Sequence, residues 1–241
     1  MLTALKTLKT LITIWRWSFR LLMVALLTLV VIQLWFLAHI AYWVDHNPAS
    51  TAFMRARLEL MRETKPQSQL RYQWTPYQRI SPHLKRAMIA AEDARFLEHG
   101  GFDWDGIKQA WERNRRERNI VAGGSTISQQ LAKNLFFSGK RTWWRKGQEA
   151  VVTVMIEALM SKQRILEIYL NVIEWGDGVF GAEAAARHHY GATAAGLSVQ
   201  QAARLAAMTP SPRRYGPASN TAYLRKRTAM IAARAQGVQT P

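Results

Sequence analysis

The sequence of 241 residues contains no cysteine. A disulfide framework, a cysteine-based zinc site and a thiol nucleophile are therefore excluded. Glycine and proline are scarce, with 14 and eight residues, which excludes a fibrous or low-complexity protein. Because 49% of the residues are hydrophobic and 10% are aromatic, an intrinsically disordered chain is excluded as well. The length is typical of one or two domains.

Acidic residues are few, with 16 against 33 basic ones, and the net charge is +17. Such a surface attracts phosphates, pyrophosphates, nucleic acid or acidic lipid. No acid precedes Asp45, whereas Lys6, Lys9, Arg16 and Arg20 lie in the first 20 residues. This asymmetry separates a basic amino-terminal end from the rest of the chain.

Residues 21–44 contain no Lys, Arg, Asp or Glu. About 20 apolar residues cross the hydrocarbon core of a bilayer as a helix, so this segment predicts a transmembrane helix. The alternative is a cleaved signal peptide, which has an apolar core of about 7–15 residues and a small-residue cleavage site. The length of the segment and the DHNPAS that follows it favour the anchor.

Basic flanks stay on the cytoplasmic side, so residues 1–20 predict a cytoplasmic tail and residues 45–241 an outer part. The outer part has 29 basic and 16 acidic residues, a net charge of +13. Nucleic acid is not an expected partner there. A membrane surface, a phosphorylated lipid or an anionic wall polymer fits better.

The outer part divides by composition near residue 80. Residues 45–80 are polar and predict a linker and an irregular lead-in segment, with one short strand pattern at 71–75. Residues 81–241 show helical periodicity and predict a mainly α domain.

Capping residues mark several of the expected helices. Ser81 and Pro82 predict a helix start, and Ser125 is expected to cap the helix that follows it. Ser198 begins a capping box that predicts a helix ending before Pro210. Helices are also expected at 103–118, 182–190 and 220–236, while 147–175 predicts one helix or two in series.

Four clusters of polar residues are candidates for chemistry. The first, residues 92–103, gathers acids and His99 where a helix runs into a Gly-Gly turn. A carboxylate there could act as a general base at the edge of a cleft. The alternative is a solvated helix end with ordinary capping.

The second cluster, residues 123–134, is a Gly-Gly-Ser-Thr turn that opens a helix. Exposed N–H groups and the helix dipole make such a turn an anion site. The alternative is a well-capped helix with a polar face. The spacing differs from that of a P-loop.

The third cluster, residues 140–149, has four cations interleaved with Trp143 and Trp144. It predicts either a pyrophosphate clamp or a basic strip on the membrane surface.

The fourth cluster, residues 162–171, has the spacing of a buried helix face, so a structural role is favoured over a catalytic one. His188 and His189 are adjacent rather than four apart, which favours ordinary histidines over a metal pair.

Taken together, the four clusters resemble the glycosyltransferase family that polymerises peptidoglycan, family 51. The patterns E-D-x-x-F-x-x-H-x-G-F-D, G-x-S-T-x-x-Q-Q-x-x-K-N, R-K-x-x-E and K-x-x-I-L-E-x-Y-L-N occur in that order within residues 92–171. A looser match covers AARLAAMTPSPRRYGP at 202–217. The resemblance implies a lysozyme-like, mainly α domain, and it fits the monofunctional members because no S-x-x-K or K-T-G motif is present.

The resemblance also implies the chemistry. Lipid II and a growing glycan strand would be joined by a β-1,4 link in one inverting displacement, with undecaprenyl pyrophosphate released. Glu92 would be the general base, and Glu149 a second catalytic acid that orders nearby cations or holds a divalent ion, Mg²⁺ or Mn²⁺. Substrate would be bound by Asp93, Phe96, His99, Ser125, Thr126, Gln129, Gln130, Lys133, Asn134, Arg141, Arg145 and Lys146. Of these, Lys133, Arg141, Arg145 and Lys146 would form the clamp for the pyrophosphate.

The resemblance further implies a single-pass protein of the bacterial inner membrane with its catalytic domain in the periplasm. Other cell-wall synthesis or division proteins are candidate partners. Two alternatives remain at this point. A lytic transglycosylase would cut glycan and would have no use for the basic cluster, and a non-catalytic wall-assembly adaptor would tolerate loss of Glu92.

Overall fold

The structure, a computed structural model, describes residues 2–117, 124–139 and 142–241. The chain divides after Trp43 into two compact units. The first unit consists of helix α1 (Leu2–Asp45) up to Trp43, and the stretch Leu11–Asp45 of this helix is long and apolar enough to cross a membrane. At 1.5 Å per residue the 35 residues of this stretch extend about 50 Å, more than the ~30 Å hydrocarbon core. The predicted 21–44 segment lies within it.

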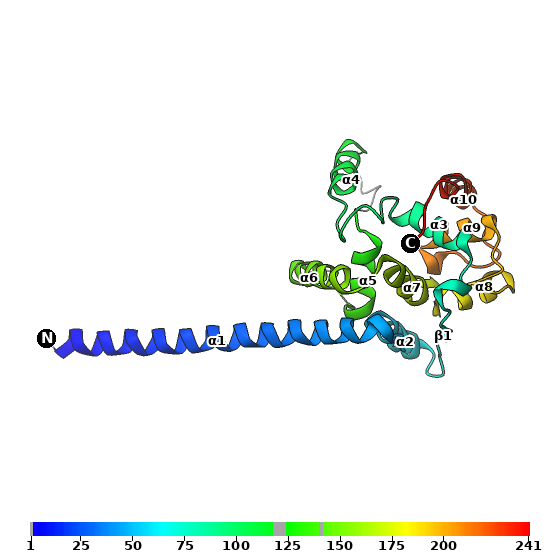
Figure 1. Cartoon of the computed structure of the whole chain (residues 1–241). Coiled ribbons are helices and arrows are strands. Elements are labelled where there is room, and N and C mark those ends of the chain that lie inside the picture. Colours follow the sequence, from blue (N-terminus) through cyan, green and yellow to red (C-terminus); the bar gives the residue numbers. More distant parts are fainter. Residues whose placement is uncertain (1, 118–123, 140–141) are drawn as a thin grey trace. The chain divides into compact units, whose positions relative to one another are not determined.

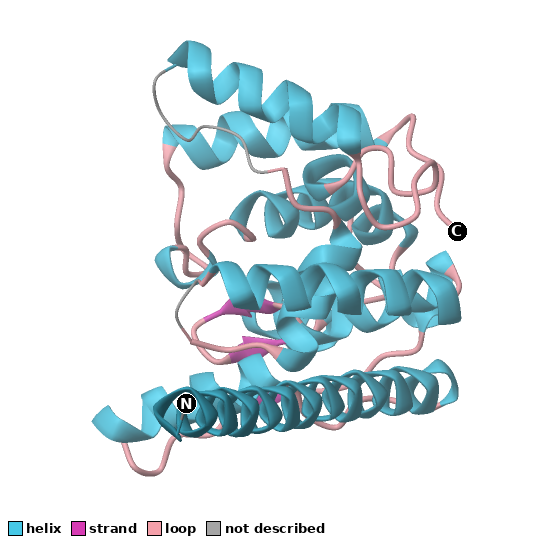
Figure 2. Cartoon of the chain, turned by 90° about the vertical axis from the view of Figure 1, so that its left-hand side faces the viewer, coloured by secondary structure: helices cyan, strands magenta, loops and turns pink. Residues whose placement is uncertain are grey.

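The second unit, residues 44–241, is mainly helical, and the expected mainly α class is confirmed (Figures 1 and 2). Two single 3-10 turns cover Tyr77–Arg79 and Pro212–Arg214. The α-helices of this unit are α2 (Ala52–Thr64), α3 (Pro82–Glu92), α4 (Trp104–Glu117), α5 (Ile127–Phe136), α6 (Trp143–Leu159), α7 (Lys162–Val172), α8 (Ala182–Tyr190), α9 (Val199–Met208) and α10 (Ala222–Ala235).

Two of the expected caps form as predicted. The Ser81 hydroxyl accepts the N–H of His83 at the start of α3, with Pro82 in the first helical position. Ser198 and Gln201 form the capping box of α9. Both sequences satisfy N–H groups that a helix start leaves without partners, so the helix boundaries follow from the sequence.

Two other caps are shifted by one residue from the prediction. Thr126 caps α5 in place of Ser125, because its hydroxyl accepts the Gln129 N–H while the Gln129 side chain accepts the Thr126 N–H. Thr221, and not Asn220, caps α10. In each pair both residues are competent caps, and the one whose oxygen reaches the third N–H of the helix takes the role.

The segment 45–80 was expected to be irregular, and this prediction is wrong for its first half. Thr51 caps α2, which buries Met54 and packs against α5. The 147–175 segment forms two helices, α6 and α7, because the chain is extended at Met160 and Ser161 caps the second helix.

The core of the second unit is built around two groups of helices. In Figure 1, α5 lies between α6 and α7, and it packs on both. Helices α3, α9 and α10 pack on one another in a second group. The alanines of α9 are buried there, and their small side chains allow close approach of the helices.

Three short strands complete the unit (magenta in Figure 2): β1 (Arg71–Tyr72), β2 (Glu174–Gly176) and β3 (Val179–Phe180). The order is β1-β3-β2, with β1 parallel and β2 antiparallel to β3. Strands β2 and β3 are buried throughout, so they lack the alternation that reveals a strand in a sequence. Gly178 turns the hairpin with φ +68°, and a Cβ there would lie 2.7 Å from Cε of Met61.

Side chains of helix α7 form hydrogen bonds with the backbone of residues 75–77, which precede α3. The Asn171 side chain accepts the N–H of Thr75 at 2.8 Å and donates to its carbonyl at 2.9 Å. Glu167 accepts the N–H of Tyr77 at 2.9 Å and pairs with Arg164 at 2.6 Å. The scaffold role favoured for the fourth cluster is therefore confirmed for these residues.

Candidate active site

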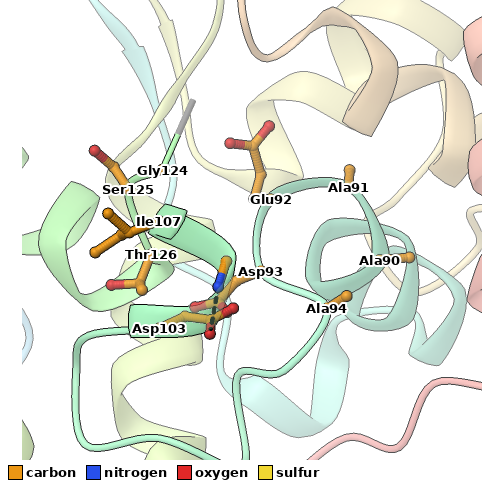
Figure 3. Close-up of a pocket in the computed structure, with 11 residues that line it drawn as sticks. Ala90, Ala91, Glu92, Asp93, Ala94, Asp103, Ile107, Gly124, Ser125 and Thr126 are labelled. Carbon is orange, nitrogen blue, oxygen red and sulfur yellow. Dashed lines mark hydrogen bonds between the residues drawn. The ribbon is translucent and has the colours of Figure 1, made fainter. Parts of the chain in front are cut away.

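A polar cavity of about 180 Å³ opens where the end of α3, the start of α4 and the start of α5 meet (Figure 3). It is lined by Ala90, Ala91, Glu92, Asp93, Ala94, Asp103, Gly106, Ile107, Gly124, Ser125 and Thr126. The first and second sequence clusters, some 30 residues apart in the chain, therefore form one site. In Figure 3 the Glu92 carboxylate points away from Asp93 and Asp103.

Glu92 is the last residue of α3, and both of its carboxylate oxygens accept hydrogen bonds. The amide nitrogen of Gln130 lies 2.8 Å from Oε2, and the hydroxyl of Thr209 lies 2.7 Å from Oε1. The side chain is half-buried. The carboxylate is thus held in one orientation by α5 and by the end of α9, while it remains open to the cavity.

The side-chain amide of Gln130 is oriented by a hydrogen bond from α7. The buried Tyr169 hydroxyl donates to the amide oxygen of Gln130 at 2.9 Å, which turns the NH₂ group toward Glu92. Burial, with the nearby carboxylates of Glu92 and Asp93, raises the pKa of Tyr169 well above its ordinary value. The phenol therefore keeps its proton and can only act here as a donor to the amide.

Asp93 occupies the start of α5. Its Oδ2 accepts the Ile127 N–H at 3.0 Å, and its Oδ1 accepts a bond from Nε2 of His99 at 2.9 Å. Since Nδ1 of His99 accepts the N–H of Gly101 at 3.1 Å, the ring proton must lie on Nε2. Burial raises the pKa of the Asp93 carboxyl, and the bonds from His99 and Ile127 oppose that rise.

This arrangement favours the capped-helix interpretation of the second cluster. In the first turn of α5, the Ile127 N–H donates to the Asp93 carboxylate, and the Gln129 N–H donates to the Thr126 hydroxyl oxygen. The Thr126 hydroxyl also reaches the Gly101 carbonyl at 2.7 Å. The turn is a capped helix start with its anion supplied internally, while Ser125 and Thr126 still line the cavity. Gly123 lies outside the described residues.

Several residues expected to bind substrate are buried and make contacts within the protein, so their role in binding remains a prediction. Phe96 is fully buried, with Nζ of Lys162 4.6 Å from its ring centre. The Gln129 side chain is used in the cap of α5. The Asn134 amide donates to the Gln130 carbonyl at 2.9 Å, one turn earlier in α5.

A group of hydrogen-bonded side chains from α5, α6 and α7 supports the turn that carries His99. Lys162 donates to the His99 carbonyl at 2.6 Å and to Glu157 at 2.8 Å. The Ser128 hydroxyl bonds the same Glu157 carboxylate. These contacts attach α7 and α6 to the turn that carries His99, so they fix the floor of the site.

From Trp143 onward, the third cluster lies on α6. Its Glu149 carboxylate is buried and lies 3.1 Å from Nε of Arg145 and 3.3 Å from Nζ of Lys146. Arg145 also donates to the Gly139 carbonyl at 2.6 Å. Glu149 therefore orders two cations, one of which, Lys146, is about half exposed.

The donor set around Glu149 does not fit a divalent ion. Magnesium takes several oxygen ligands, whereas both Glu149 oxygens already face cationic nitrogens. In the part of the chain that the structure describes, no group of three or more His, Cys, Asp or Glu side chains could hold a metal. His189 contacts the Trp175 carbonyl at 2.9 Å, and His188 contacts Arg71 at 2.8 Å, as ordinary histidines do.

Two of the cations predicted for the clamp are not on α6 in the described structure. Lys133 is exposed on α5, with Nζ 5.9 Å from the ring centre of Phe53. Arg141 lies outside the described residues, as does Lys140. The clamp of Lys133, Arg141, Arg145 and Lys146 therefore remains a prediction.

Three residues of the site were not singled out for chemistry in the sequence. Tyr169 has the spacing of a core residue, and its hydroxyl reaches Gln130 from a segment 39 residues away. Thr209 lies in the loosest of the matched motifs. Asp103, which lines the cavity and accepts from Arg95 at 3.2 Å, was visible as the last acid of the first cluster.

Comparison with known proteins gives consistent results. Residues 58–236 match the family model described as Transglycosylase. The chain is 57% identical over 226 residues to a biosynthetic peptidoglycan transglycosylase of Nitrosospira multiformis, covering 94% of this chain and 98% of the relative. It is 59% identical over 220 residues to a protein of the same name from Methylobacillus flagellatus, covering 91% and 96%.

Proposed function

The chain belongs to the transglycosylase family, and on that premise we propose that it polymerises lipid II into β-1,4-linked glycan strands with release of undecaprenyl pyrophosphate. Its relatives are named for peptidoglycan biosynthesis, and the described fold is the helical, lysozyme-like one of the family. The reaction is a glycosyl transfer, so the chain is an enzyme.

In the proposed step Glu92 is the general base. Its carboxylate takes the proton of the acceptor 4-hydroxyl while that oxygen bonds to the anomeric carbon of the donor. The bond from that carbon to the pyrophosphate oxygen breaks, and its electron pair leaves with the pyrophosphate. The anomeric centre inverts, and Glu92 later returns the proton to water.

The observation that carries the proposal is that Glu92 lines the cavity with its carboxylate held by two donors, one on each oxygen. A general base must be ionised and aimed at its substrate before the reaction. Donors on both oxygens hold the carboxylate in one orientation. Ser125, which also lines the cavity, offers a hydroxyl to a sugar, whereas the Thr126 hydroxyl is used within the protein.

The leaving pyrophosphate needs positive charge rather than a proton donor. We assign that role to Lys133, Arg141, Arg145 and Lys146, with Glu149 ordering the last two. Arginine can bind phosphate through two parallel bonds, and lysine adds a point charge. No step is assigned to a metal, since Glu149 already faces these cations.

We further propose that residues 21–44 anchor the protein in the inner membrane, with residues 1–20 in the cytoplasm and the catalytic domain, residues 81–241 with their lead-in 45–80, in the periplasm. The basic amino-terminal flank and the apolar α1 support this orientation. Anchoring suits an enzyme whose donor and acceptor are both lipid-linked.

The test uses the full chain in detergent with labelled lipid II. Products are separated on a gel with and without a muramidase. A ladder that the muramidase removes is the expected result. Binding of lipid II without any polymer would point to an adaptor, and release of fragments from preformed glycan would point to a lytic enzyme; either result would overturn the proposal.

A further inference from the structure

Thr209 follows the last residue of α9, and its hydroxyl lies within reach of two acceptors. Oγ1 is 2.7 Å from Oε1 of Glu92 and 2.8 Å from the carbonyl oxygen of Ala206, one turn earlier. A hydroxyl has one proton and two lone pairs, so it can donate to only one of these atoms at a time. The state of Glu92 therefore decides which of them receives the proton.

When Glu92 is ionised, both of its oxygens can only accept. The Thr209 hydroxyl then donates to Oε1, and this bond to a charged group is stronger than the one to a carbonyl. When Glu92 carries a proton on Oε1 that points toward Thr209, the Thr209 oxygen accepts it. The hydroxyl proton then turns to the Ala206 carbonyl, so rotation of one O–H bond suffices and no heavy atom has to move.

The other oxygen of Glu92 has no such freedom. Gln130 faces Oε2 with its amide nitrogen, which only donates, and Tyr169 keeps that amide from turning over. Gln130 can therefore only donate to Oε2, and a proton on Oε2 that pointed toward this amide would meet no acceptor. Of the two partners, Thr209 is the one that can accept a proton carried by Glu92, so it matches the protonated form at Oε1 as well as the ionised one.

We propose that Thr209 is a positioning residue for Glu92 that hydrogen-bonds its side chain in both the ionised and the protonated form. This rests on the proposed function, in which Glu92 gains and loses a proton in every turnover. Thr209 keeps the carboxyl group in one orientation through that cycle. It lies half-buried, so the bond is partly shielded from water.

The experiment compares wild type with Thr209→Val, which has the same shape without the hydroxyl, and with Thr209→Ser, which retains it. Rates of lipid II polymerisation are measured from about pH 5 to about pH 9. We expect Thr209→Val to lower kcat about tenfold with little change in KM. Since the ionised form loses a donor, the acidic limb of the profile should move to higher pH. Thr209→Ser should restore both.

Thr64→Val is the matched control, because the Thr64 hydroxyl also bonds the carbonyl three residues earlier, that of Met61, at 3.0 Å. It lies at the end of α2 and is exposed, and its profile should equal that of wild type. Other titratable groups near the cavity are Asp93, Asp103 and Tyr169, and among the described residues their hydrogen bonds do not involve Thr209.

A Thr209→Val profile that superimposes on that of wild type would overturn the proposal, as would a Thr209→Ser variant impaired as much as Thr209→Val. Thr209→Ala, smaller at a half-buried position, gives a second hydroxyl-free variant if the valine prevents folding. Glu92→Gln is assayed in parallel. If it retains turnover, the base assignment itself fails; if it is inactive while Thr209→Val is normal, only the role of Thr209 fails.

Discussion

The amide nitrogen of Gln130 lies 2.8 Å from Oε2 of Glu92, and the orientation of that amide is set by a buried phenol, that of Tyr169. The candidate base is therefore held by a chain of hydrogen bonds that starts in the core of α7 and ends at the cavity. Such preorganisation removes motion that the reaction would otherwise have to restrict. It also makes each link separately testable.

Tyr169→Phe should lower both the rate and the stability. The ring stays packed, but the Gln130 amide loses the bond that keeps its nitrogen turned toward Glu92. We expect kcat to fall three- to tenfold and the free energy of unfolding to fall by about 1 kcal/mol. Polymerisation kinetics and thermal unfolding of the full chain in detergent measure the two effects.

Tyr72→Phe is the control for that change. The Tyr72 hydroxyl donates to the Pro48 carbonyl at 2.9 Å, and it plays no part in the proposed site. It should reduce stability by a similar amount and leave kcat unchanged. Equal kinetics for the two variants would contradict the proposed link from Tyr169 to Glu92.

Asn171→Leu should be strongly destabilising. The substitution keeps the shape but leaves the buried N–H and C=O of Thr75 without their partners. Each buried group left unpaired costs about 1–3 kcal/mol, so a loss of about 2–6 kcal/mol is expected for the two groups. A loss below about 1 kcal/mol in chemical denaturation would mean that water or a local shift replaces both bonds.

Gly101→Ala should destabilise the turn that carries His99. Gly101 has φ +97°, and a Cβ there would lie 2.8 Å from Cγ2 of Thr153. Backbone strain and the clash together predict a loss of about 1–3 kcal/mol. Thr153→Ser removes that methyl group, so the double variant should recover part of the loss; purely additive effects would show that the clash does not contribute.

The free energy of unfolding should decrease as the pH becomes acidic, partly because of His189. Burial, with smaller effects from His188 and Arg204, lowers the pKa of His189, and the bond to the Trp175 carbonyl only partly offsets this. The unfolded chain then binds more protons than the folded one, so the stability contribution is present above about pH 6.5 and is lost as the pH falls below it.

His189→Gln should therefore flatten the pH dependence between about pH 6.5 and about pH 5 without abolishing it, because burial also lowers the pKa of His188. The glutamine amide can still donate to the Trp175 carbonyl. Unfolding free energies across that range test this. A variant with the same slope as wild type would show that His189 is not responsible.

Local signals in the sequence were sufficient for much of the fold. Ser81-Pro82 and the Ser198 capping box predict helix starts because capping depends on residues three positions apart. Helix α2 was missed since its charged sequence buries little beyond Met54. Strands β2 and β3 were missed because they are short and buried on both faces.

The site shows the same division between local and distant contacts. Glu92 and Gln130 stand in recognisable motifs, so they could be selected from the sequence. That Asp93 would occupy the start of α5, or that Thr209 would reach Glu92, depends on contacts over 34 and 117 residues. Spacing within a motif carries no information on such contacts, which follow only from the packing of α3, α5 and α9.

The most direct test of the central claim is the activity of Glu92→Gln. The amide has nearly the same shape but cannot take a proton from the acceptor hydroxyl. We predict that kcat for lipid II polymerisation falls by about 10²- to 10⁴-fold while lipid II binding is retained, and that Glu98→Gln, at an exposed glutamate paired with Arg95, behaves as wild type. A Glu92→Gln variant that polymerises lipid II at the wild-type rate would contradict the assignment of Glu92 as the general base.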